Sequence, residues 1–125
     1  MKKVFISYLH SDEPFVRRLV EHLGNFKTSG WRDDADISAG NIFADRIRSA
    51  IKQADALVVL VSTRSRESRW VNFEVGAGLA MGVPVIPVVI EGEGQLPEPL
   101  RDVRSVDARN RPIEEVVSEI EKSIK

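Results

Sequence analysis

The sequence predicts an α/β domain built around a parallel β-sheet. Short strand-like runs alternate five times with helical segments, the pattern of consecutive strand–helix–strand units with right-handed crossovers. Two of the runs, residues 56–62 (ALVVLVS) and 84–90 (PVIPVVI), are almost continuously apolar, as expected of strands covered by helices on both faces. In sheets of this kind, ligands bind at the carboxyl ends of the strands, near the switch in strand order.

The first half of the chain is expected to hold two strands and two helices. Residues 4–8 (VFISY) form a β-rich run, and residues 13–24 (EPFVRRLVEHLG) place apolar side chains at helical spacing, with Pro14 early and Gly24 as a stop. A loop should follow, with a short strand around Trp31 and Arg32. Residues 32–41 (RDDADISAGN) have the composition of a polar, turn-rich loop. The next helix has one apolar face, made of Phe43, Ile47, Ala50, Ile51 and Ala54.

The second half is expected to hold three strands and two helices. After the strand at 56–62, a helix is predicted from about residue 68 to 81, followed by the strand at 84–90. Pro87 is unfavourable inside a central strand and is expected at an irregular or ladder-free position. Residues 91–99 (EGEGQLPEP) form a loop, residues 103–108 (VRSVDA) a weak last strand, and residues 113–124 (IEEVVSEIEKSI) an amphipathic helix.

Composition narrows the class of protein. A chain of 125 residues is expected to be a single domain, residues 1–125, since domains usually hold about 100–200 residues. The net charge of −1 provides no general attraction for nucleic acid or anionic membranes, and neither partner is expected. The apolar patch at residues 4–9 is too short for a signal peptide, and no run is long enough to span a membrane, so a cytoplasmic location is expected. The absence of cysteine excludes disulfides, thiolate metal sites and cysteine nucleophiles.

Three glycines in "GAGLAMG" superficially resemble a dinucleotide-binding fingerprint. The spacing of Gly76, Gly78 and Gly82 is one residue off that motif, and the match is weak by itself. The glycines of the fingerprint open a helix, but here the next strand starts near residue 84 and leaves no room for a crossover. The helix must therefore precede the glycines, whose expected role is close helix packing.

This chain lacks the key residues of other ligand sites that are common in α/β proteins. A phosphoreceiver domain needs an aspartate after the third strand and a lysine after the fifth, where this chain has Ser62 and Asp107, and there is no phosphate-binding P-loop. Asp33, Asp34 and Asp36 could chelate a hard cation, but a solvated acidic loop is favoured and no metal is expected. The two histidines lack metal-ligand spacing: His22 is expected on a helix surface, whereas His10 follows the first strand, where a ligand could reach it.

Glu74 is the one ionisable residue between Trp70 and Gly82. Glutamate is rarely buried without a partner, because losing water disfavours its charged form. On a helix its neighbours three and four residues away are Trp70, Val71, Ala77 and Gly78. From the residues alone, Glu74 is either partly exposed, hydrogen-bonded within the protein, or turned toward a polar ligand.

Four stretches, in this order, resemble the Toll/interleukin-1 receptor (TIR) domain family: "VFISY", "DDADISAG", "SRWVNFE" and "GVPVIPVVI". The resemblance covers residues 3 to about 90, and the remainder fits by secondary-structure pattern. It implies a flavodoxin-like three-layer sandwich, with a five-stranded parallel sheet in the order 2-1-3-4-5 flanked by helices. Many TIR domains cleave NAD+ with a glutamate in an S-x-W-C-x-x-E motif. Ser68, Trp70 and Glu74 match that motif, and Val71 replaces the cysteine.

The resemblance also implies the roles of particular residues. Glu74 is expected to be catalytic, and residues 33–43 correspond to the family's BB loop, which gates the pocket and makes assembly contacts. Basic residues are common where this chain has Leu9, which leaves the phosphate contacts open. NAD+ is expected as substrate, with no separate cofactor. The expected substrate-binding residues are Tyr8, Leu9, His10, Asp33, Ser38, Ile42 and Trp70.

The function implied by the resemblance is an NAD+ nucleosidase in bacterial immune (antiphage) or effector signalling. Its products would be nicotinamide and either ADP-ribose or a cyclic isomer, a choice that the sequence leaves open. The alternative is a non-catalytic adaptor that assembles with other TIR domains. A third class, base-exchanging nucleoside transferases of similar topology, would act on nucleosides and not on dinucleotides.

Overall fold

The computed structural model describes residues 2–8, 10–24, 26–32, 49, 51–63, 69–92, 96, 100–101 and 103–124. Within these ranges the strands are β1 Lys2–Tyr8, β2 Phe26–Arg32, β3 Ala56–Val61, β4 Val85–Val89 and β5 Val106–Asp107. The helices are the 3-10 helix η1 His10–Asp12 and the α-helices α1 Glu13–His22, α3 Arg69–Ala80 and α4 Ile113–Ser123. Residues 49 and 51–53 are also helical, which agrees with part of the helix expected after the polar loop.

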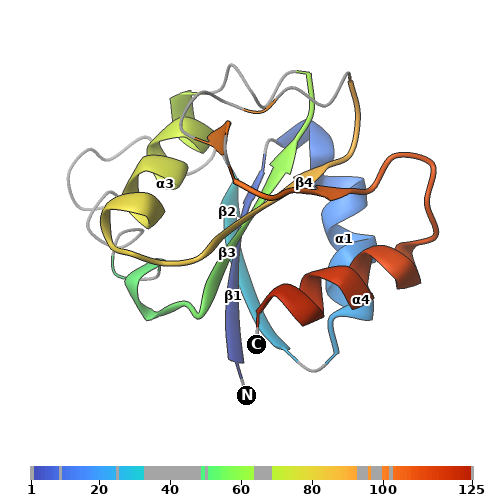
Figure 1. The fold of residues 1–125 in the computed structure, drawn as a ribbon, viewed down its shortest axis with the longest axis horizontal. Coiled ribbons are helices and arrows are strands. Elements are labelled where there is room, and N and C mark those ends of the chain that lie inside the picture. Colours follow the sequence, from blue (N-terminus) through green and yellow to red (C-terminus); the bar gives the residue numbers. More distant parts are fainter. Residues whose placement is uncertain are drawn as a thin grey trace.

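The strands form one parallel sheet in the order β2-β1-β3-β4-β5. This order confirms the three-layer α/β fold that the sequence and its resemblance predicted. Helix α3 covers one face of the sheet, and α1 and α4 cover the other (Figure 1). Strand order reverses between β1 and β3, so the switch point lies where these two central strands end.

Alternate residues of the central strands build two separate cores. The core under α1 and α4 takes Val4, Ile6 and Tyr8 from β1, and the core under α3 takes Phe5 from the same strand. All six residues of β3 are buried, which explains its continuously apolar sequence. Helix α1 contributes Val16 and Leu19 at helical spacing, and α4 contributes Ile113, Val116, Val117 and Ile120.

Strand β2 is longer than the sequence predicted. A loop was expected after Gly24, with a short strand only around Trp31 and Arg32, but the strand already begins at Phe26. That expectation was wrong because β2 is an edge strand, paired with β1 along its whole length. Polar residues and glycine, such as Lys27, Ser29 and Gly30, are tolerated at a sheet edge although their β propensity is low.

Pro87 lies inside β4, opposite Val59 of β3. The carbonyl of Val89 accepts a hydrogen bond from Ala108, so alternate residues of β4, including Pro87, direct their backbone groups toward the β5 side. Strand β5 pairs with Val88 and Val89 and ends short of Pro87. The missing N–H of proline therefore faces the β5 side, where the pairing starts only at Val88. The expectation of an irregular or ladder-free position was wrong for the β3 side, where Pro87 pairs with Val59 inside a regular strand.

The glycines of "GAGLAMG" lie in the second half of α3 and directly after it, as predicted. A Cβ atom on Gly78 would lie 2.7 Å from Leu57 Cδ2, so a glycine here lets the helix approach β3 closely. Gly82 follows the helix with φ of 74°, a conformation that glycine adopts without steric cost. None of the described helices is both long enough and apolar enough to cross a membrane.

Candidate active site

Among the described residues of β1, Ser7 is the one buried polar residue on the face that lies against α3. It follows Phe5 by two residues, so both side chains point to the same face of the sheet, toward α3. The strand lies between β2 and β3, with Ser7 opposite Trp31 and Val59. The Ser7 side chain is 0% exposed. The sequence therefore places a hydroxyl under α3, one residue from the carboxyl end of a central strand.

Glu74 reaches that hydroxyl from α3. It lies four residues before Gly78, so the two residues share one face of the helix. Because Gly78 has no side chain, this face can lie directly against the sheet, with Leu57 and Val85 beneath it. Helix α3 contacts β1, β3 and β4. The close approach brings a glutamate from the helix within reach of β1.

The Ser7 hydroxyl donates a hydrogen bond of 2.7 Å to Glu74 Oε1. Glu74 is 0% exposed, like Ser7, and Val75 beside it belongs to the apolar core under α3. A carboxylate in such surroundings needs hydrogen bonds, because burial without them is costly. The bond to Ser7 supplies one of these contacts and ties α3 to β1 across 67 positions of the sequence.

This arrangement suits the stabilisation of positive charge. A carboxylate held in a fixed position at low dielectric interacts more strongly with a developing cation than one in water. The site lies near the carboxyl ends of β1 and β3, at the switch point of the sheet, where α/β proteins bind ligands. The position of Glu74 in the fold is thus established, and its expected catalytic role stays a prediction.

Among the other predicted site residues, the structure describes the side chain of Tyr8, which lies away from Glu74. Tyr8 follows Ser7 but packs into the opposite core, under α1 and α4, so it does not share the face of Glu74. His10 lies on η1, just past β1, and Trp70 lies on the first turn of α3; for both, the structure describes the backbone alone. The remaining predicted residues lie outside the described residues and stay predictions: Leu9, Asp33, Ser38 and Ile42.

The sequence prediction did not include Ser7 among the site residues. The available signal was the single hydroxyl among the apolar residues of "VFISY", at a position whose alternation directs it into a core. The described part of the chain has three buried polar side chains, Ser7, Ser62 and Glu74. Ser62, at the end of β3, donates a hydrogen bond of 2.9 Å to Asp12 Oδ2 instead.

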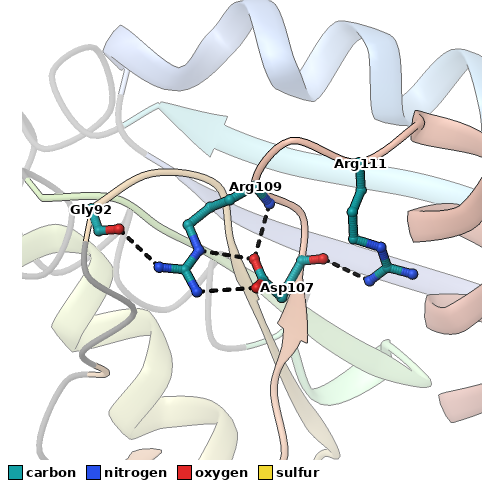
Figure 2. Close-up of polar contacts among 4 residues, drawn as sticks. All are labelled: Gly92, Asp107, Arg109 and Arg111. Atoms are coloured by element: carbon teal, nitrogen blue, oxygen red, sulfur yellow. Dashed lines mark hydrogen bonds and ion pairs between the residues drawn. The ribbon is translucent and has the colours of Figure 1, made fainter.

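A second polar cluster joins the ends of β4 and β5 (Figure 2). The Arg109 guanidinium donates two hydrogen bonds to the Asp107 carboxylate, of 2.9 and 3.0 Å, and one of 2.9 Å to the Gly92 carbonyl. The hydrogen bonds from the Arg109 side chain and backbone lower the pKa of Asp107 to about 2. Arg111 donates to the Asp107 carbonyl on the other side. These contacts fix the segment after β5 against the turn after β4.

No set of three or more metal-binding side chains comes together among the described residues. His22 lies on the exposed surface of α1, as predicted, with its Nδ1 near the Arg18 carbonyl and its Nε2 3.8 Å from Glu114. The expected acidic loop with Asp33, Asp34 and Asp36 lies outside the described residues.

Comparison with known proteins identifies the family. The model of the TIR domain family matches residues 4–122. The chain belongs to the TIR domain family. This assignment extends the resemblance seen in the sequence beyond residue 90, since the family match includes β5 and α4.

Individual relatives of this TIR domain are distant. It is 26% identical over 125 residues to the probable 2′ cyclic ADP-D-ribose synthase TcpO of Methanobrevibacter olleyae, covering 94% of this chain and 37% of that protein. The chain thus spans well under half the length of that relative.

Solved structures share the fold. The TIR domain of the Toll-related receptor TRR-2 from Hydra magnipapillata superposes with a TM-score of 0.75 at 23% identity, covering 97% of this chain and 96% of that one. A 2-deoxyribosyltransferase from Leishmania mexicana superposes with a TM-score of 0.67 at 17% identity, covering 98% of both chains. At these identities both likenesses concern the fold alone.

Proposed function

We propose that this TIR domain cleaves the nicotinamide–ribose bond of NAD+, with Glu74 as the catalytic residue. The observation that carries the proposal is a glutamate, fully buried in α3 and hydrogen-bonded to β1, at the switch point of the sheet. Its place in the S-x-W-C-x-x-E pattern and the name of the relative from Methanobrevibacter olleyae support the same chemistry.

The proposed reaction breaks the bond between C1′ of the ribose and the nicotinamide nitrogen. The bonding electron pair goes to the nitrogen, so nicotinamide leaves as a neutral base and needs no proton. The ribose becomes cation-like, as in glycoside hydrolysis, and water adds at C1′ and loses a proton. NAD+ and water thus give nicotinamide, ADP-ribose and a proton. In the cyclising variant a ribose hydroxyl of the same molecule takes the place of water.

Glu74 serves this reaction through its charge and its fixed position. Its carboxylate holds the ribose hydroxyls and stabilises the positive charge that develops at C1′. One acidic group is sufficient because the leaving group requires no acid catalyst. Because the reaction needs one carboxylate and no acid catalyst, a single ionisable residue in the stretch from Trp70 to Gly82 is enough.

The second candidate function is an adaptor that assembles with other TIR domains without catalysis. The complete burial of Glu74 favours this function, because a substrate has to reach the carboxylate before it can react. The proposed cleavage therefore requires an opening beside Glu74. Self-assembly is the change expected to provide it, with antiphage or effector signalling as the proposed setting.

The test measures free nicotinamide released from NAD+ over a range of protein concentrations. Wild type should release nicotinamide, with a rate per subunit that increases with concentration. Glu74→Gln, which keeps the size of the side chain, should lose at least about 10²–10³-fold in rate. Glu114→Gln is the matched control, because its side chain is 72% exposed and lies on α4, on the other side of the sheet. No release by wild type at any concentration would favour the adaptor.

A further inference from the structure

We propose that Ser7 is a positioning residue for Glu74, whose hydroxyl holds the carboxylate in its reactive place. This inference rests on the proposed function, because it assigns to Ser7 a role in the same reaction. The two residues come from different elements, β1 and α3, and meet through the 2.7 Å hydrogen bond to Oε1. Ser7 acts through Glu74 and has no assigned contact with substrate.

The position of Ser7 makes it a rigid support. Strand β1 is paired on both sides, with β2 and with β3, so its backbone cannot shift without breaking two ladders. The neighbouring residues Phe5 and Ile6 are fully buried in opposite cores. A serine side chain has a single rotatable carbon bond, so its hydroxyl inherits this rigidity. Glu74, with three side-chain torsions, needs such a partner to keep one orientation.

The chemistry of the hydrogen bond favours the charged form of Glu74. A buried carboxylate is disfavoured by the loss of water, and a donor directed at one of its oxygens compensates for part of that loss. Ser62 offers a contrast within the same sheet: it is buried at the end of β3, but its hydroxyl donates to Asp12. The two buried serines therefore have separate carboxylate partners, and their roles can be tested independently.

The experiment compares Ser7→Ala, Ser7→Thr and Ser62→Ala with wild type in the nicotinamide-release assay. A hydrogen bond to a charged group contributes enough that its loss should lower kcat of Ser7→Ala about 10- to 100-fold. KM should change less than about threefold. Ser7→Thr keeps the hydroxyl and should restore kcat to within about threefold of wild type. Ser62→Ala should leave kcat unchanged, because the hydroxyl of Ser62 donates to Asp12 Oδ2.

A spectroscopic measurement tests the contact without relying on activity. The ¹³C carboxyl resonance of Glu74, assigned by its absence in Glu74→Gln, should shift in Ser7→Ala and stay in place in Ser62→Ala. Thermal unfolding checks that each variant is folded. Should Ser7→Ala fail to fold, Ser7→Cys replaces it, since a thiol is a weak donor of similar size.

The outcomes separate this inference from the proposed function. A folded Ser7→Ala with wild-type kcat, in a protein whose Glu74→Gln variant is inactive, overturns the role of Ser7 and leaves the function intact. Equal losses in folded Ser7→Ala and Ser7→Thr overturn it as well, because a hydroxyl would then not be what matters. If wild type releases no nicotinamide, the proposed function fails, and the positioning role of Ser7 in that reaction fails with it. The carboxyl resonance then still reports whether the hydroxyl holds Glu74.

Discussion

Gly78 is expected to set the distance between α3 and the sheet, and its substitution tests the geometry of the site. A Cβ at this position would lie 2.7 Å from Leu57 Cδ2, whereas carbon atoms in contact are usually about 3.5–4.0 Å apart. Leu57 is fully buried, and Val85 and Ile51 also lie within 4 Å of the added atom. Leu57 Cδ2 is the end of a side chain, so Leu57 has to shift within the buried core to admit the methyl group. Gly78→Ala must push the helix outward or strain the core.

The magnitude follows from two opposing effects. Overpacking a core costs about 1–3 kcal/mol. Replacing glycine by alanine inside a helix contributes about 0.5–1 kcal/mol in the other direction. We therefore expect Gly78→Ala to lower the free energy of unfolding by up to about 2.5 kcal/mol. Gly76, two residues earlier in α3, has no atoms within 4 Å of an added Cβ. Gly76→Ala should raise the free energy of unfolding by about 0.5–1 kcal/mol.

The assay measures the urea unfolding of wild type and both variants, with far-ultraviolet circular dichroism as the signal. Because the helix-propensity gain is common to both variants, the difference between them reports the packing cost, about 1–3 kcal/mol. Equal stabilisation of the two variants would refute the reasoning, since α3 would then not lie close to β3. Gly78→Ala should also reduce nicotinamide release, because Glu74 is one turn away on the same helix face.

Two further predictions concern the ends of α3 and β5. Gly82 has φ of 74°, a backbone conformation that is strained for alanine. Gly82→Ala should therefore lower the free energy of unfolding, measured in urea, by about 1 kcal/mol. An unchanged free energy of unfolding would show that alanine is not strained at this position. The pKa of Asp107 is lowered from 3.8 to about 2, so the folded state binds fewer protons between these pH values than the unfolded state. This contribution to stability is complete above about pH 4 and is lost as the pH falls toward 2. In Asp107→Asn, the urea concentration at the midpoint of unfolding should fall less steeply than in wild type as the pH is lowered through this range. An equally steep fall in the two proteins would show that the Arg109 contacts do not stabilise the fold.

The sequence predicted the fold because its periodicities are local. The continuous apolar run of β3 and the helical spacing in α1 and α4 identify these elements directly. The full length of β2 was not predictable in this way. Residues 26–30 become a strand through pairing with β1, a long-range contact that their own composition does not indicate.

The sequence indicated one residue of the candidate site, Glu74, and missed the residue that contacts it. Glu74 was recognisable as the one ionisable residue between Trp70 and Gly82, and its side chain is fully buried. Its contact with Ser7 depends on how α3 lies across β1, which the sequence does not encode in any local pattern. Tyr8 was expected to bind the substrate because of the family resemblance, but strand alternation directs its side chain into the core under α1 and α4.

The central claim, that Glu74 is a catalytic carboxylate, is tested most directly by the rate of nicotinamide release per subunit. Wild type and Glu74→Gln are compared at equal, high protein concentration, after thermal unfolding has shown that both are folded. The account predicts release by wild type and a loss of at least about 10²-fold in the variant. Equal release by the two proteins would contradict it.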